Sequence, residues 1–182
     1  LVYISQPTEY GTLYSLQELE ELSAVCRERD LKLFIDGARL AYALASPAND
    51  VTLADLARLT DVFYIGGTKC GSLFGEAVVI PERGSIRQFV TQMKQHGALL
   101  AKGRLLGVQF EALFEDGLYL TIGEPAVKAT ARIREALKRA GYVVTMDSPT
   151  NLTFVALDQA GHERLSDKVR YSIWETLPDG RY

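Results

Sequence analysis

The chain has 182 residues, of which 47% are hydrophobic and 24% charged, proportions typical of a soluble globular protein. A net charge of −3 gives no electrostatic reason to expect nucleic acid or an anionic membrane surface as a partner. No apolar run reaches the roughly 18 residues that a membrane span needs. With two cysteines and two histidines, neither a disulfide framework nor a metal site is expected. We therefore expect a cytoplasmic protein without a metal ion.

Short apolar runs alternate with amphipathic segments in the first half of the chain. The runs at 1–4, 33–35 and 62–65 predict buried strands, and segments 16–28, 38–45 and 53–59 predict the helices between them. Ser15 and Glu18 form the pattern of a capping box, and Thr52 is the expected cap of the third helix. This alternation predicts an α/β fold with a mostly parallel sheet, to which residues 77–80 add one more strand.

The second half of the chain is mainly helical at first. Residues 82–138 carry a helical pattern that is broken near Gly97, Gly117 and Gly123. Strands are then expected at 142–145, 152–157 and 169–174, with a helix at 161–168. We therefore predict two units: residues 1–116, which are part of a large domain, and residues 117–182, which belong to a smaller α+β domain. Both ends look truncated, because the chain opens on a strand and stops just after a turn.

Polar residues follow the second and third predicted strands. Asp36 comes directly after three apolar residues, and Lys69 lies 33 positions later in the string Gly66-Gly67-Thr68-Lys69, a separation of about one βαβ unit. Ligands bind beyond the carboxyl ends of parallel strands. A lysine that condenses with an aldehyde, one strand from a carboxylate that keeps a pyridine nitrogen protonated, suits pyridoxal phosphate. The Thr68 hydroxyl is a candidate donor to the cofactor phosphate.

Residue spacing alone leaves simpler interpretations open. An Asp-Gly pair after a strand is often only a turn, with Arg39 as the salt-bridge partner of Asp36. A Gly-Gly-Thr-Lys string is often an ordinary polar loop. Cys70, next to Lys69, has no feature that marks an activated thiol and is expected to be a small packing residue.

Longer segments carry a resemblance to a known family. SQPTEYGTLYSLQELEELSAVC, LFIDGARLAYAL and FYIGGTKCGSLFGEAVVI resemble, in order and spacing, the large domain of the threonine aldolases. These are pyridoxal-phosphate-dependent enzymes of fold type I, the aspartate-aminotransferase-like superfamily. The resemblance continues through MKQHGALLAKGRLLGVQFEALF and is most specific at DGAR and GGTKCG.

The resemblance implies a role for each matching residue. Lys69 corresponds to the Schiff-base lysine, Asp36 to the partner of the pyridine nitrogen, and Arg39 to the contact of the phenolic oxygen. Lys94 corresponds to a basic residue that reaches the cofactor phosphate, often from a neighbouring subunit. An arginine is commoner at that position in the family, and an exposed helix charge is an equally good interpretation of Lys94.

The implied function is cleavage of the Cα–Cβ bond of threonine-like β-hydroxy-α-amino acids to glycine and an aldehyde. A homodimer or homotetramer is expected from the family. The alternatives are another β-eliminating lyase, an amino-acid racemase, or a non-catalytic fragment with half of an active site. The phosphate loop and the group that grips the substrate carboxylate are expected outside this chain.

Overall fold

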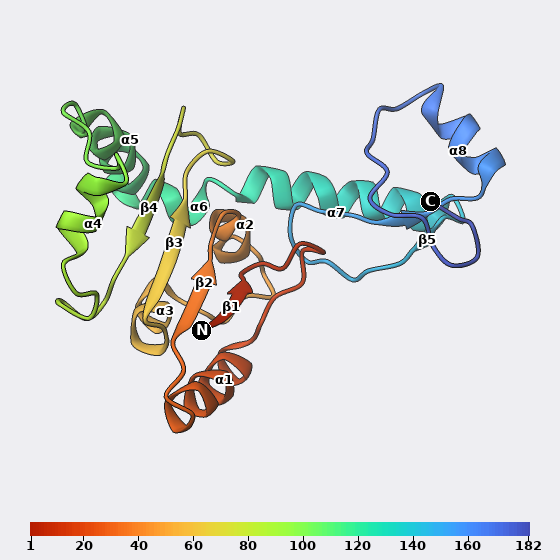
Figure 1. Ribbon diagram of the computed structural model, residues 1–182. Helices are drawn as coiled ribbons and strands as arrows, with labels where there is room; N and C mark the ends of the chain where they lie inside the picture. Colours follow the sequence, from red (N-terminus) through yellow and green to blue (C-terminus); the bar gives the residue numbers. More distant parts are fainter.

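The computed structural model describes residues 1–182, and a four-stranded sheet forms its first half (Figure 1). Its strands are β1 (Val2–Ser5), β2 (Leu33–Asp36), β3 (Val62–Gly66) and β4 (Glu76–Val79), in the order β1-β2-β3-β4. The first three are parallel, and β4 runs antiparallel beside β3. The predicted α/β fold with a mostly parallel sheet is thus confirmed, and the three parallel strands end at a common edge.

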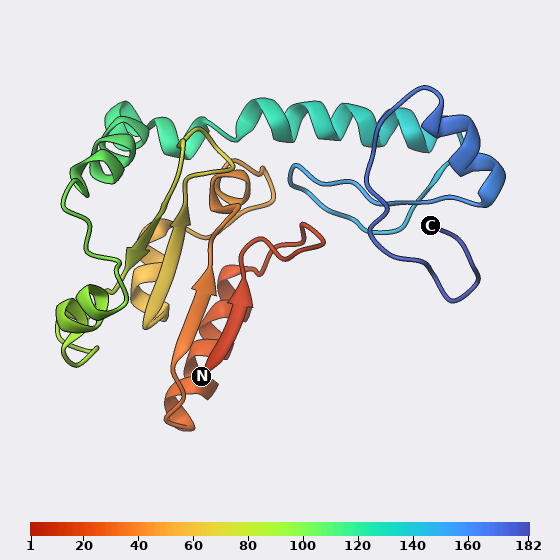
Figure 2. The same cartoon turned by 45° about the horizontal axis from the view of Figure 1, so that its top comes forward.

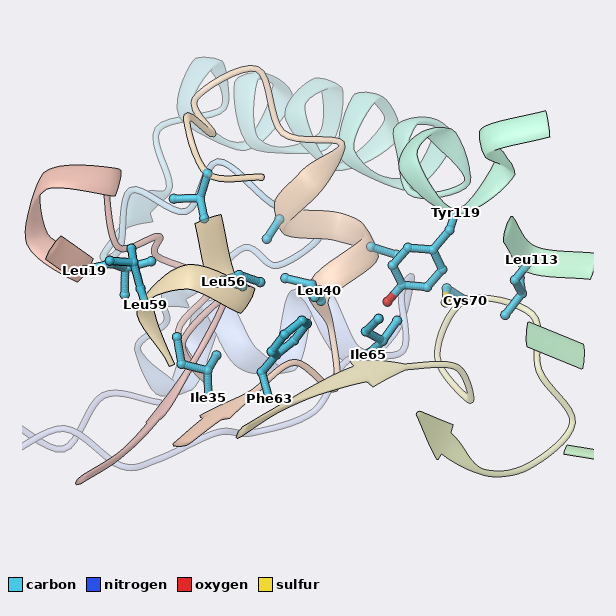
Figure 3. Packing of buried hydrophobic residues seen from close by; sticks show 13 residues of the cluster. Leu19, Ile35, Leu40, Leu56, Leu59, Phe63, Ile65, Cys70, Leu113 and Tyr119 are labelled. Carbon is cyan, nitrogen blue, oxygen red and sulfur yellow. The ribbon is translucent and has the colours of Figure 1, made fainter. Parts of the chain in front are cut away.

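Helices α1 (Leu16–Glu28), α2 (Leu40–Leu44) and α3 (Leu53–Leu59) connect the parallel strands and cover one face of the sheet (Figure 1). The two helix starts predicted at Ser15 and Thr52 are confirmed. Ser15 and Glu18 form a complete capping box, and Thr52 forms another with Asp55, so that the first-turn N–H groups are satisfied. Beneath the helices, alternate strand residues such as Ile35 and Phe63 are buried in one apolar cluster (Figure 3).

The opposite face of the sheet carries side chains that no helix of this chain covers. Tyr3 stacks on Phe34 with ring centroids 5.2 Å apart, and Tyr64 meets Phe34 edge-on at 4.9 Å. We call these three residues the aromatic row. It continues to Val78, which lies beside Tyr64 in the β3–β4 register. Tyr3 is 56% exposed and Val78 49%.

Four helices follow the sheet: α4 (Phe89–Gln95), α5 (Arg104–Phe114), α6 (Leu118–Thr121) and α7 (Glu124–Arg139), with a short 3-10 turn at Glu115–Gly117. The predicted breaks at Gly97, Gly117 and Gly123 fall between them. No residue of α4 is buried, whereas Tyr119 and Ile122 pack into the main apolar cluster. The domain boundary at residue 116 stays a prediction, and this packing supports placing it a few residues later, at α7.

Helix α7 runs from the sheet to a small second unit (Figures 1 and 2). That unit contains β5 (Val143–Val144) paired antiparallel with β6 (Val155–Ala156), and α8 (Gln159–Ser166). The predicted strand at 169–174 was wrong, because this segment pairs with no strand and its residues are exposed. The backbone of Leu157, just after β6, instead exchanges two hydrogen bonds of 2.9 Å with Tyr182.

A loop after β1, residues 6–14, joins the two units. The buried Gln6 side chain holds its base, donating to the Tyr14 carbonyl and accepting from the Tyr14 N–H, each at 3.0 Å. At its tip, the Gly11 carbonyl accepts hydrogen bonds from the hydroxyls of Ser148, at 3.0 Å, and Thr150, at 3.1 Å. Both hydroxyl residues are fully buried, so this contact ties the sheet to the second unit. None of the helices is both long and apolar enough to cross a lipid bilayer.

Candidate active site

The loops after β2 and β3 meet at the carboxyl edge of the sheet. The Gly66 N–H, at the end of β3, donates to the Gly37 carbonyl at 3.0 Å, so the residue after Asp36 is hydrogen-bonded to the strand that leads to Lys69. Side chains do not fit at this contact. A Cβ on Gly37 would lie 2.0 Å from the Tyr64 carbonyl oxygen, and one on Gly66 2.4 Å from that of Ala38. The glycines therefore allow the close approach of the two loops to each other.

The Asp36 carboxylate is held from two directions. Its Oδ1 accepts the Ala38 N–H at 2.8 Å, and its Oδ2 accepts the Tyr3 hydroxyl. The hydrogen bond to Asp36, together with burial, raises the pKa of Tyr3 to about 12, so this phenol is a donor at neutral pH. Each carboxylate oxygen can accept more than one hydrogen bond, which leaves Asp36 able to bind a further N–H group.

The main chain around Lys69 is fixed by tyrosine hydroxyls from two helices. Tyr42, on α2, donates to the Lys69 carbonyl. Tyr119, on α6, donates to the Gly66 carbonyl at 2.8 Å, and Figure 3 shows its hydroxyl oxygen pointing toward Ile65 and the end of β3. Burial raises the pKa of Tyr119, which keeps this donor protonated. The Lys69 side chain itself is exposed.

Cys70 also supports the Gly66 carbonyl group. Its thiol donates to the Gly66 oxygen at 3.2 Å, and burial raises the pKa of the thiol. A buried thiol with a raised pKa is inert rather than nucleophilic. The expectation that Cys70 packs into the structure is therefore confirmed.

Thr68 is engaged differently from the sequence-based prediction. Its hydroxyl donates to Glu76 Oε1 at 3.0 Å, and the other oxygen of Glu76 accepts the Gly67 N–H at 3.0 Å. A threonine hydroxyl has one hydrogen, so in this arrangement Thr68 has none left for a phosphate. The predicted phosphate donor therefore fastens its own loop to β4.

Arg39 and Lys94 differ in their relation to this edge. Arg39 is the N-cap residue of α2, three positions after Asp36. Neither Arg39 nor Lys69 has an acidic partner, because the ion pairs of the chain lie elsewhere. The salt bridge between Arg39 and Asp36, which the simpler interpretation of the sequence predicts, is therefore not formed within residues 1–182. Lys94 is exposed on α4, beyond β4 (Figure 1), so this chain does not bring it to its own Asp36 and Lys69.

Residue-by-residue inspection of the sequence missed Tyr3, Tyr42, Tyr119 and Glu76. Each lies inside a strand or helix, where an aromatic or acidic residue is usually explained by packing or by a solvated face. The loops they support were identified, because glycines and a lysine directly follow a strand. No group of three or more His, Cys, Asp or Glu side chains suited to a metal ion occurs in residues 1–182.

Comparison with known proteins decides the family. The family described as Beta-eliminating lyase matches residues 1–160. The chain belongs to the beta-eliminating lyase family. Within this family match lie the whole sheet, both loops of the candidate site and helix α7.

Solved and curated relatives agree with this assignment. The structure of Leishmania major threonine aldolase superimposes on 99% of this lyase-family chain with a TM-score of 0.93 and 47% identity, over 53% of its own length. The low specificity L-threonine aldolase of Pseudomonas aeruginosa is 32% identical over 91% of this chain and 48% of its own length. At 17% identity, Thermus thermophilus aspartate aminotransferase has the same fold, with a TM-score of 0.65 over 91% of this chain. The expected type I fold is confirmed, and the chain spans about half the length of these threonine aldolases.

Proposed function

We propose that the complete protein is a pyridoxal-phosphate-dependent lyase that cleaves the Cα–Cβ bond of threonine-like β-hydroxy-α-amino acids, giving glycine and an aldehyde. The observation that carries this proposal is that the ends of β2 and β3, next to Asp36 and three residues before Lys69, are hydrogen-bonded from the Gly66 N–H to the Gly37 carbonyl at 3.0 Å. This hydrogen bond occurs in a chain that is 47% identical to a threonine aldolase of known structure.

The residues at this edge fit pyridoxal phosphate by the chemistry of their side chains. Lys69 offers an exposed amine without an acidic partner, and Asp36 offers a fixed carboxylate with free lone pairs. In the proposed site Lys69 carries the cofactor, Asp36 faces its pyridine nitrogen, and Arg39 contacts its phenolic oxygen. The cofactor, when bound, supplies an electron sink for the carbanion left by bond cleavage. The chain's own contribution is to hold the Asp36 carboxylate and the main chain of Lys69 in place.

The phosphate end of the cofactor is the less supported part of the proposal. Thr68 remains a candidate there only if its hydroxyl leaves Glu76, to which it donates at 3.0 Å. Lys94 remains a candidate only for the site of another subunit, since it projects from a helix with no buried residue. We therefore propose Asp36, Arg39 and Lys69 as the cofactor contacts of this chain.

A homodimer or homotetramer is the assembly that we propose. Apolar side chains on and around α4 and α5 are exposed although they lie within the family match. They are Val90, Leu99, Leu100, Leu105 and Val108. Exposed apolar side chains of this kind are typical of surfaces that are covered in an assembly. A cytoplasmic location is proposed from composition and from two cysteines that are free and buried.

The first test is covalent labelling of the full-length protein. Borohydride reduction in the presence of pyridoxal phosphate should leave a pyridoxyl group on the peptide that contains Lys69. The label should disappear in Lys69→Ala and remain in Lys168→Ala, which removes an equal charge from an exposed position far from the sheet. A label that persists in Lys69→Ala contradicts the assignment.

The second test is product analysis, because the family name describes elimination rather than aldol cleavage. Threonine should give glycine and acetaldehyde. A keto acid and ammonia would instead favour a β-eliminating lyase, and interconverted enantiomers would favour a racemase. Lys69→Ala should reduce every cofactor-dependent product to background.

A further inference from the structure

The side chains of Tyr3 and Asp36 lie on the same face of the sheet. Strands β1 and β2 are parallel, with Tyr3 beside Phe34 and Ser5 beside Asp36. Residues two apart on a strand share a face, so Phe34 and Asp36 both point to the side that bears the aromatic row. The Tyr3 ring lies almost flat on that of Phe34, with 9° between their planes. Its hydroxyl reaches the neighbouring strand and donates to Asp36 Oδ2.

Two donors from different elements therefore fix one carboxylate. The Ala38 N–H holds Oδ1 from the loop after β2, at 2.8 Å, and Tyr3 holds Oδ2 from β1. With one donor alone, the carboxylate could turn about the bond that joins it to Cβ. With two, the directions of its remaining lone pairs are set before any ligand arrives. The other ionisable groups that face Tyr3 are Tyr64 and Glu9, and neither donates to Asp36.

We propose that Tyr3 is a positioning residue that orients the Asp36 carboxylate toward the pyridine nitrogen of the cofactor. This inference rests on the proposed function, and it adds to it a residue from a strand outside the DGAR and GGTKCG motifs. A side chain preorganised in its bound geometry improves binding, because less freedom is lost when the ligand arrives. The hydroxyl of Tyr3 thus acts on the cofactor through Asp36.

A purely structural role for the Tyr3 hydroxyl has little support. The side chain is 56% exposed, and its ring stacks on Phe34 without help from the oxygen. Tyr64 provides a matched control on the same face. Its ring packs against Phe34 at 4.9 Å, and its hydroxyl has no hydrogen-bond partner in residues 1–182. Tyr64→Phe therefore removes the same atom from the same row while leaving both hydrogen bonds to Asp36 in place.

The test measures pyridoxal phosphate binding to the full-length protein in four variants: Tyr3→Phe, Tyr64→Phe, Asp36→Asn and the Tyr3→Phe, Asp36→Asn double variant. Loss of a hydrogen bond to a charged group should raise the dissociation constant of the cofactor about tenfold in Tyr3→Phe. Tyr64→Phe should leave it unchanged. In the Asp36→Asn background, Tyr3→Phe should have no further effect, because the group that Tyr3 positions has been replaced. Equal effects with and without Asp36 would overturn the proposal.

A spectroscopic measurement separates positioning from general loosening. With ¹⁵N-labelled cofactor, NMR reports the pH at which the ring nitrogen loses its proton. Positioning predicts that this pH falls in Tyr3→Phe and not in Tyr64→Phe, since a misaligned carboxylate stabilises the protonated ring less. An unchanged or raised value would refute it. If the wild type carries no cofactor on Lys69, the proposed function itself fails, and that result is distinct from equal binding by Tyr3→Phe and the wild type.

Discussion

Replacing Tyr119 by phenylalanine should weaken the fold by about 1–2 kcal/mol. The Tyr119 side chain is fully buried, and its hydroxyl donates to the Gly66 carbonyl at 2.8 Å. The substitution keeps the ring, which stacks on Phe114 at 5.1 Å, so no cavity is created beyond the size of one oxygen. The cost is the hydrogen bond and the poorer satisfaction of a buried carbonyl, which keeps only the weak thiol donor of Cys70.

Urea unfolding of the full-length protein measures this cost. The midpoint should fall while the dependence of the free energy on urea stays the same, because the area exposed on unfolding is unchanged. Tyr64→Phe should change the free energy of unfolding by less than about 0.5 kcal/mol. If Tyr119→Phe and Tyr64→Phe have the same midpoint, the Gly66 carbonyl does not depend on Tyr119, and the reasoning about the Lys69 loop is refuted.

Two further substitutions test other contacts. Gly37→Ala should destabilise the protein by about 3 kcal/mol or more, since its Cβ would lie 2.0 Å from a main-chain oxygen. Gly107→Ala, in open space on α5, should instead stabilise the protein by up to about 1 kcal/mol. Equal thermal midpoints for the two variants would contradict this expectation. At Asp61, burial raises the pKa, but the Leu33 N–H and Lys32 lower it more. The ionised form thus adds stability above the unfolded pKa of about 3.9, and this is lost as the pH falls. Asp61→Asn should be less stable than wild type at pH 7, with the difference shrinking below about pH 4 in chemical unfolding; a difference that is constant with pH would exclude this.

Local signals predicted most of the first half of the chain. Helices α1 and α3 begin at the residues expected from Ser15 and Thr52, because a capping box is specified within four residues. The parallel arrangement followed from the alternation of elements. The strand expected at 169–174 does not form, because pairing also requires a partner strand beside the segment, which its own residues do not specify. Such a choice is made by residues far away in the sequence.

The candidate site, too, could be predicted only in part from the sequence. The meeting of the Asp36 and Lys69 loops could be expected, since adjacent parallel strands bring their carboxyl ends together. The partner of the Thr68 hydroxyl could not, because Glu76 is brought beside Gly66 only by the antiparallel register of β3 and β4. Nor did the sequence single out Tyr3, which is joined to Asp36 across 33 positions by the pairing of two strands.

The contact at Gly11 has a consequence for the order of folding. Its carbonyl is bound by hydroxyls that lie 137 and 139 residues later in the chain, among the longest separations bridged by any side chain here. Closing so long a loop costs entropy. We therefore expect the sheet with its helices to form before residues 148–150 attach. Amide exchange at the loop tip should accordingly report a smaller opening free energy than exchange in β2.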